Sequence, residues 1–222
     1  MKLRNILTVK NLTKRYSVTG SGTTLNCVNL NVSQGSTIAL TGEIGSGKST
    51  FLNIMAGLEP PSSGEVFFND ISLWKISESD RSKFRRNELS IIFQNFNLIH
   101  SLTVWENISF QAKLSGKWSA PFAEYLLKET GLTKIRNSYP DQISGGEQQR
   151  VAILRSIIAK PQLLLADEPT GNLDDQNSHV IIELLLNLVS EIGSTLIVAT
   201  HSQSFASQLD QTFTLRSGKL RS

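Results

Sequence analysis

An α/β fold with a mostly parallel central sheet is the fold class that the sequence predicts, and three kinds of segment lead to it. Short, nearly continuous apolar runs at 36–42, 162–168 and 194–202 are typical of parallel strands buried on both faces. Helical periodicity alternates with these runs, and a glycine-rich loop joins the first run to the first helix. The expected helices lie at 48–58, 147–160 and 178–193. Strands that alternate with helices predict a parallel sheet with helices packed against it.

Two further parts of the fold are predicted outside this pattern. Residues 7–16 and 24–32 alternate apolar and polar side chains, as half-buried antiparallel strands do. Residues 95–146 carry apolar side chains at helical spacing without a clear strand, which indicates an inserted helical subdomain. We therefore expect one domain over all 222 residues, with a core and an N-terminal antiparallel β subdomain over about 1–94 and 147–222.

Composition limits the classes of protein to which the chain can belong. With 39% hydrophobic and 18% charged residues the chain can bury a core, and disorder is not expected. The formal net charge of +3 is too small to indicate nucleic acid binding. Cys27 is the only cysteine, which excludes an internal disulfide, and we expect a small buried residue there. The apolar run at 180–189 is too short for a membrane span, so a soluble, cytoplasmic protein is expected.

The loop at 42–49 reads GEIGSGKS and matches the phosphate-binding pattern G-x-x-x-x-G-K-[ST] in full. Its context also fits, because an apolar strand precedes it and a helix follows. Glycines allow backbone N–H groups to turn inward around phosphates, and the helix N-terminus adds a partial positive charge. In such a loop Lys48 reaches the β- and γ-phosphates, and the Ser49 hydroxyl ligates Mg²⁺. The loop therefore predicts a nucleotide with Mg²⁺ as the ligand.

Two carboxylates close the second apolar run, where the sequence reads LLLADE. A phosphate loop needs a second contact to Mg²⁺, which an Asp at a strand end usually supplies, and Asp167 stands in that position. Glu168 points in another direction and is expected to accept a proton from the attacking water. Gln94 and His201 also follow apolar strands, at the edge where α/β ligand crevices form. We expect Gln94 to sense metal or water, and His201 to contact the γ-phosphate or position the water.

A second glycine-rich turn, ISGGEQQR at 143–150, opens another predicted helix. One interpretation is a capping box, in which Ser144 bonds the amide of Glu147 and the Glu147 carboxylate reaches back. A cap does not require two glycines, however, and a hydroxyl, Gly145, Gly146 and a helix N-terminus also make an anion site. Because the chain has one set of metal and base residues, this second site is expected to meet a γ-phosphate held by another copy. Both interpretations stay open, a cap in the free chain and a phosphate contact in a head-to-tail dimer.

Together these motifs resemble the nucleotide-binding subunit of an ATP-binding cassette (ABC) transporter, over essentially the whole chain. The resemblance implies a P-loop NTPase (RecA-like) core, ATP and Mg²⁺ as ligands, ATP hydrolysis and a homodimer that closes across ATP. The matching positions are the Walker A loop, Gly42, Glu43, Ile44, Gly45, Ser46, Gly47, Lys48, Ser49 and Thr50; the Q-loop residue and metal contact Gln94; the signature, Ser144, Gly145, Gly146 and Glu147; Walker B, with Asp167 as metal ligand and Glu168 as catalytic base; the D-loop Asp174 in GNLD; the switch histidine His201; and Tyr16, which stacks on adenine.

Three positions depart from the usual motifs. Ile143 and Glu147 replace the commoner Leu and Gln of the signature, and both changes are mild. Ile44 places a bulky apolar side chain in the phosphate loop, where a small or polar one is usual.

Longer stretches are similar to one subfamily, the lipoprotein-release, macrolide-export and cell-division ATPases (LolD, MacB and FtsE types). These stretches are FQNFNLIHSLTVWENI, YPDQISGGEQQRVAI and LLADEPTGNLD. The resemblance implies a peripheral bacterial protein at the cytoplasmic face of the inner membrane, which drives a separate permease in export or in the extrusion of lipoproteins or peptides. A short helix of the permease would dock near Phe96, Leu98, Leu102 and Trp105, unless these residues form the core of the helical insertion.

Two other functions stay open. An ATPase of the division type would transmit force through a membrane partner to a periplasmic cell-wall hydrolase. A soluble cassette ATPase acting on ribosomes or DNA is disfavoured, because such proteins usually carry two cassettes or a long coiled coil between motifs. No nucleic acid partner is therefore expected.

Overall fold

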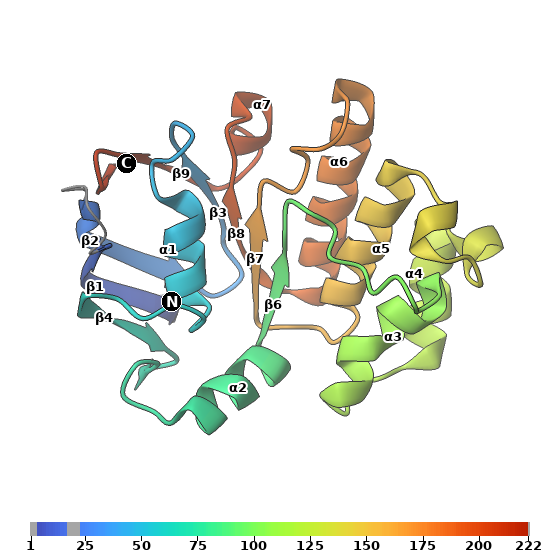
Figure 1. The fold of residues 1–222 in the computed structure, drawn as a ribbon, viewed down its shortest axis with the longest axis horizontal. Coiled ribbons are helices and arrows are strands. Elements are labelled where there is room, and N and C mark those ends of the chain that lie inside the picture. Colours follow the sequence, from blue (N-terminus) through green and yellow to red (C-terminus); the bar gives the residue numbers. More distant parts are fainter. Residues whose placement is uncertain (1–3, 17–22, 222) are drawn as a thin grey trace. The chain divides into compact units, whose positions relative to one another are not determined.

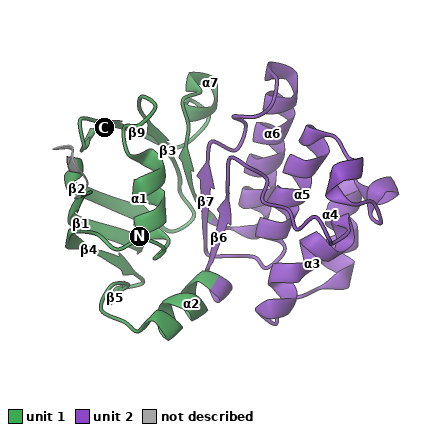
Figure 2. Cartoon of the chain, viewed as in Figure 1, with its two compact units in different colours: residues 1–85, 195–222 green, residues 86–194 purple. Residues whose placement is uncertain are grey.

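The computed structural model of the chain describes residues 4–16 and 23–221, which divide into two compact units (Figure 2). The first unit contains Met1–Arg85 and Thr195–Ser222, and the second unit contains Arg86–Ser194. The expected division into a core, a β subdomain and an inserted helical subdomain stays a prediction. Among the described residues, no helix has the length and apolar character that a membrane span needs.

An antiparallel sheet in the first unit contains the two N-terminal strands expected from the alternation of side chains. β1 (Asn5–Arg15) pairs with β2 (Thr23–Ser33) on one side and with β4 (Ser63–Phe68) on the other (Figure 1). β5 (Ile71–Ser72) completes the sheet beside β4. The two predicted antiparallel strands are therefore confirmed, whereas the two short strands that follow have no periodic signal of their own.

The parallel strands of the first unit lie on either side of the strand that precedes the phosphate loop. β3 (Thr37–Thr41) pairs in parallel with β8 (Thr195–Ala199) and β9 (Gln211–Arg216), and β10 (Lys219–Arg221) pairs antiparallel with β9. All residues of β8 are buried, as expected for a strand covered on both faces. The strands predicted at 36–42 and 194–202 are confirmed. The hairpin of β9 and β10 was not predicted, because most of its side chains are exposed and form no apolar run.

The described helices of the first unit are α1 (Lys48–Met55), α7 (Gln203–Ala206) and most of α2 (Glu78–Asn87), which ends two residues inside the second unit. α1 begins directly after the phosphate loop, and the four-residue α7 follows β8. α2 is almost entirely polar and buries Phe84, whose ring lies 4.7 Å from that of Phe68. Ion pairs from Arg81 and Arg85 to Glu78 support this helix. A helix with so little apolar surface gives no hydrophobic period to read, and it was missed.

The second unit consists of two parallel strands and the helices around them. β6 (Leu89–Ile92) pairs with β7 (Leu163–Asp167), with Ile92 opposite Ala166. The helices are α3 (Val104–Leu114), α4 (Ala120–Glu129), α5 (Gly145–Ile157) and α6 (Asp175–Ile192), with 3-10 turns at Thr133–Ile135 and Pro140–Gln142. α5 packs against α3 on one side and α6 on the other (Figure 1). The predicted helical character of 95–146 is confirmed.

Cys27 is exposed, which corrects the expectation that it is buried. In the ladder, Lys14 pairs with Leu25 and Leu12 pairs with Val28, so two residues of β2 lie opposite Thr13. This count defines a β-bulge, and Cys27 takes a left-handed backbone conformation there, with φ of 52°. The bulge breaks the alternation of faces, and the Cys27 side chain therefore points outward.

Candidate functional site

The phosphate loop connects β3 to α1 through a backbone path that only glycine can follow at two positions. Gly42 and Gly47 have φ values of 148° and 101°. A Cβ atom on Gly42 would lie 2.4 Å from the carbonyl oxygen of Leu215, and one on Gly47 would lie 2.8 Å from the Thr24 methyl carbon. Side chains are thereby excluded from the loop where its backbone must turn. A cradle of this kind fits a phosphate group.

Lys48 is the first residue of α1, and its side chain folds back over the loop. It is 7% exposed, and its Nζ donates hydrogen bonds to the carbonyl oxygens of Gly42 at 2.8 Å and Glu43 at 3.2 Å. The ammonium group is thus held inside the loop, where a phosphate would meet it. Ser49 is exposed beside it, and its hydroxyl is an oxygen ligand of the kind that Mg²⁺ prefers.

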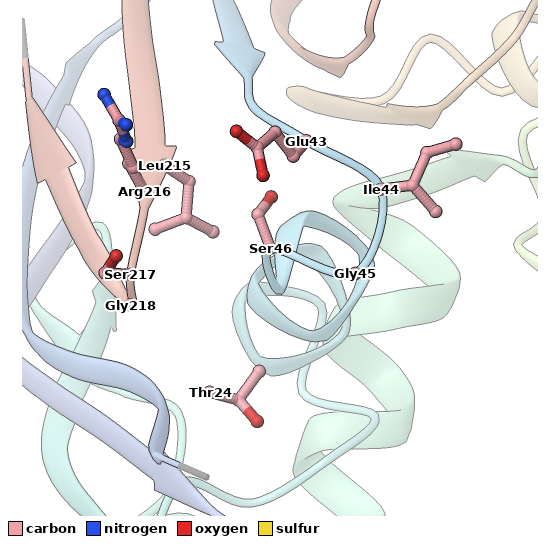
Figure 3. Close-up of a pocket in the computed structure, with 9 residues that line it drawn as sticks. All are labelled: Thr24, Glu43, Ile44, Gly45, Ser46, Leu215, Arg216, Ser217 and Gly218. Carbon is pink, nitrogen blue, oxygen red and sulfur yellow. The ribbon is translucent and has the colours of Figure 1, made fainter.

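A pocket of about 510 Å³ lies between the phosphate loop and the β9–β10 hairpin (Figure 3). Ser46 points into it, and its hydroxyl oxygen is buried without a hydrogen-bond partner among the described residues. Ile44 points away from the other lining residues and is 98% exposed. The bulky Ile44 side chain, which departs from the motif, therefore lies outside the phosphate cradle and takes up no space within it.

Tyr16 directly follows β1, and polar contacts hold its hydroxyl group. The hydroxyl donates to Glu59 Oε1 at 2.6 Å and lies 3.3 Å from Thr50 Oγ1 on α1. Burial of the hydroxyl, and then its bond to Glu59, raise the pKa of Tyr16. The side chain is 47% exposed, which leaves ring surface for a ligand. Glu59 was not identified from the sequence, because it belongs to no motif.

In the second unit, the ends of β6 and β7 bring together three residues that the sequence singled out. β6 and β7 are parallel neighbours, so their C-terminal ends lie at the same edge of this strand pair. Asp167 is the last residue of β7, and Gln94 comes two residues after the end of β6. A Cβ atom on Gly171 would lie 3.1 Å from Gln94 Nε2 and 3.4 Å from Glu168 Cβ, so both side chains border this glycine. The Asn172 side chain also donates to the Gln94 carbonyl oxygen at 2.9 Å. His201 follows β8 in the first unit and is exposed.

Glu168 has a backbone conformation that is unusual for its residue type. Its φ of 46° lies in the left-handed region, and its carbonyl oxygen accepts a hydrogen bond from Gly171 N at 2.9 Å. A non-glycine residue held in this region costs about 1–3 kcal/mol and is often found at functional sites. The tight turn therefore fixes the direction in which the Glu168 side chain leaves the backbone, immediately after the strand.

The second glycine turn forms a complete capping box at the start of α5. Ser144 N and Oγ both donate to Glu147 Oε2, at 2.8 and 2.7 Å, and Glu147 N donates to Ser144 Oγ at 3.4 Å. The Ser144 hydroxyl, and then its amide, hold the pKa of Glu147 below its usual value. One of the two interpretations of this turn is thus confirmed for the single chain.

The signature turn also contacts the start of α6. A Cβ atom on Gly146 would lie 3.3 Å from Asn177 Oδ1, closer than most real Cβ contacts. Asn177 donates its backbone N–H to Asp174 Oδ1 at 2.9 Å and its side-chain amide to Asp174 Oδ2 at 2.7 Å. Asp174, the predicted D-loop residue, is therefore the N-cap of α6. Asn177 therefore connects Asp174 to the turn at Ser144–Glu147. No sequence motif predicts this contact.

The structure corrects part of the predicted docking surface. Leu98 is 7% exposed and belongs to the core of the second unit. The Trp105 ring contacts the Arg136 guanidinium, 4.2 Å from its centroid, and meets the Trp118 ring edge-on with the centroids 5.2 Å apart. The exposed apolar side chains lie further along α3, where Phe110 and Leu114 border a hollow of about 320 Å³. Leu102 lines the same hollow, whereas Phe96 is half-buried beside Gly145.

Comparisons with known proteins agree with these motifs. The family model described as ABC transporter matches residues 25–171. The chain is 38% identical to the lipoprotein-releasing system ATP-binding protein LolD of Treponema denticola, over 98% of both chains. It is 43% identical to the uncharacterised ABC transporter ATP-binding protein YbbA of Escherichia coli K12, over 100% of this chain and 99% of the other. Among solved structures it resembles the ATP-binding cassette MJ0796, a dimer bound to ADP and phosphate, with a TM-score of 0.87, 36% identity and 97% of each chain covered.

Proposed function

Because this chain belongs to the ABC transporter family and is an ATP hydrolase that uses Mg²⁺, we propose that it is the ATP-binding subunit that powers a separate membrane permease. Its fold is the P-loop NTPase fold, with an antiparallel β part and packed helices, as predicted. The observation that carries the proposal is the phosphate loop, whose glycines allow the backbone to turn against Leu215 and Thr24 and whose buried Lys48 supplies the charge.

In this proposal the phosphate loop binds ATP by exchanging one set of contacts for another. The Lys48 ammonium leaves the two loop carbonyl oxygens and bonds the β- and γ-phosphates instead. Glu43 to Thr50 contribute backbone N–H groups and the positive end of α1. The proposed oxygen ligands of Mg²⁺ are Ser49, Asp167 and Gln94, and the bound ion neutralises charge on the phosphates.

Glu168 is the proposed general base of hydrolysis. Its carboxylate would accept a proton from the water that attacks the γ-phosphate, and a positioned base of this kind contributes about 10²–10⁴ in rate. The left-handed turn at Glu168 and its contact with Gly171 support this role, because they fix the start of the side chain. His201 would position the same water or contact the γ-phosphate.

Two copies of the chain are proposed to close head to tail across two ATP molecules. Ser144 and Gly145 are exposed at the N-terminus of α5, which carries the positive end of the helix dipole. They can therefore face the γ-phosphate that is bound by the partner copy. To do so, the Ser144 hydroxyl must leave Glu147. The dimeric state of the solved cassette MJ0796 supports this arrangement.

The permease is proposed to dock on the outer face of α3, and the chain to lie at the cytoplasmic face of the bacterial inner membrane. Leu102, Phe110 and Leu114 give an apolar hollow, and Glu106 and Lys113 border it with opposite charges. A short amphipathic helix fits such a groove. The name of the lipoprotein-releasing relative supports export or extrusion of lipoproteins or peptides as the work done.

The proposal is tested by purifying the chain with its membrane permease in lipid vesicles and measuring ATP hydrolysis. We expect the permease to change the hydrolysis rate and Glu168→Gln to abolish it, while Glu183→Gln, an exposed carboxylate on α6, leaves the rate unchanged. Hydrolysis that is the same with and without the permease, at saturating ATP, would contradict the proposed function.

A further inference from the structure

A partly buried ion pair in the first unit lies against the ring of Tyr16. Lys14 Nζ lies 2.8 Å from Glu59 Oε1 and donates to the carbonyl oxygen of Pro60 at 2.7 Å. It also lies 5.0 Å from the centroid of the Tyr16 ring. A cation over the face of an aromatic ring is attracted by the negative face of its π-system. Lys14 therefore covers one face of the ring, while its partner Glu59 holds the hydroxyl group.

The surroundings of this pair are well suited to fixing a side chain. The Lys14 and Glu59 side chains are only 11% and 25% exposed, so water screens their attraction less than that of a surface pair. Burial alone would raise the pKa of Glu59, but the bonds from Lys14 and Tyr16 outweigh it, and the pKa is lowered. The end of β1 is fixed as well, because Arg15 N donates to Ser62 Oγ at 3.0 Å.

The same contacts connect the ring to the helix of the phosphate loop. Glu59 follows the end of α1, and its backbone N–H still donates to the carbonyl oxygen of Asn53 on that helix. Thr50 lies in the first turn of α1, next to Ser49, and its hydroxyl is 3.3 Å from the Tyr16 hydroxyl. Tyr16 is thus attached to both ends of the helix that begins at the phosphate loop.

We propose that Glu59 and Lys14 are positioning residues that hold the Tyr16 ring at a fixed place relative to the phosphate loop, with one face covered by Lys14 and the other open to adenine. This inference rests on the proposed function, in which Tyr16 stacks on the base. Since Glu59 and Thr50 engage the hydroxyl, the ring contributes stacking to the base and no hydrogen bond. The benefit is pre-organisation, because a ring that is already fixed loses little freedom when ATP binds.

The test compares two ligands by calorimetry, MgATP and magnesium tripolyphosphate, which has the phosphates but no base. Tyr16→Ala should weaken ATP binding about tenfold, since base stacking on an aromatic ring is typically of this size, and leave tripolyphosphate binding unchanged. Glu59→Ala should weaken ATP binding by about 3- to 10-fold, again without an effect on tripolyphosphate. Tyr16→Phe keeps the ring, removes its hydroxyl contacts and should weaken ATP binding to a similar extent. Glu65→Gln, a control for an ion-paired carboxylate on β4, should bind both ligands as the wild type does.

The outcomes separate this inference from the function on which it rests. If Tyr16→Ala leaves the ratio of the two affinities unchanged, adenine does not stack on Tyr16 and the proposed function fails at that residue. If Tyr16→Ala changes the ratio but Glu59→Ala and Tyr16→Phe do not, the positioning role alone is overturned. Equal weakening of both ligands by Glu59→Ala would also overturn it, because that pattern reports damage to the phosphate loop. Tyr16→Phe decides the matter if Glu59→Ala fails to fold.

Discussion

Replacing Glu147 by glutamine should strengthen the ATP-dependent dimer. In the single chain the Ser144 hydroxyl donates to the Glu147 carboxylate at 2.7 Å, a charge-assisted hydrogen bond. The proposed dimer needs the same hydroxyl for the γ-phosphate of the partner copy. The carboxylate therefore competes with dimer formation, and its negative charge also lies at the helix end that must receive a phosphate. A neutral amide at this position weakens the competing bond and removes the charge.

The size of the effect follows from the hydrogen bond that is weakened. A bond to a charged group contributes about 1.5–3 kcal/mol and a neutral one about 0.5–1.5 kcal/mol, so the change releases Ser144 by about 1 kcal/mol. Ser144 is exposed, and solvent screening keeps the gain at the lower end of this range. A two-fold symmetric dimer contains the contact twice, which gives about 2 kcal/mol or a dimer about 30-fold tighter. Glutamine still completes a capping box, so the free energy of unfolding should change by less than about 1 kcal/mol.

The dimer constant is measured by sedimentation in MgATP, with Glu168→Gln in the background to prevent hydrolysis. The chain offers a matched control in the capping box of α3, where Thr103 Oγ1 donates to Glu106 Oε2 at 2.9 Å. Glu106→Gln should change the stability as little as Glu147→Gln does and leave the dimer constant unchanged. A dimer that is equally tight or weaker with glutamine at 147 would refute the competition for Ser144.

Three further predictions concern the loop, the helix cap and the docking surface. Gly42→Ala should lower the free energy of unfolding by about 3 kcal/mol and abolish ATP binding, since its Cβ atom meets a backbone oxygen at 2.4 Å; thermal unfolding and calorimetry check this, and normal ATP binding would contradict it. Because the pKa of Glu147 is lowered in the folded chain, the stability it adds is complete above its unfolded pKa of 4.5 and is lost as the pH falls through the folded pKa. Ser144→Ala should therefore be destabilised relative to the wild type more at pH 7 than in acid, where only the loss of the uncharged N-cap bond remains. A difference in the free energy of unfolding that is the same at both pH values would contradict the linkage. Phe110→Ser should remove the effect of the permease on hydrolysis while leaving the basal rate unchanged, and Val180→Ser, an exposed apolar residue of α6, should change neither rate; a normal response of the Phe110→Ser variant to the permease would place the docking surface elsewhere.

The sequence predicts the elements of the fold that have a strong hydrophobic period. β3, β7 and β8 are apolar runs, and α5 and α6 carry apolar residues at helical spacing with recognisable caps. α2 escapes prediction because ion pairs, and a single buried Phe84, support it. The burial of Cys27 is predicted wrongly because a bulge shifts the alternation of side chains by one residue. No local sequence pattern predicts this bulge.

Some residues of the candidate site can likewise be predicted from the sequence, and others cannot. Motif positions such as Lys48 and Ser144 can be identified from sequence, because the motifs place those residue types at a fixed spacing. Glu59 and Lys14 cannot, since they meet Tyr16 through tertiary contacts between β1 and the segment after α1. The apolar surface is also a tertiary property, since Leu98 and Leu102 look alike in sequence and only the first is buried.

The central claim is that hydrolysis takes place in a dimer that ATP closes, and sedimentation of Glu168→Gln tests it most directly. We expect this variant to sediment as a monomer without nucleotide and as a dimer in MgATP, and Ser144→Arg in the same background to remain monomeric in both. Glu168→Gln that binds MgATP yet stays monomeric at high protein concentration would contradict the claim.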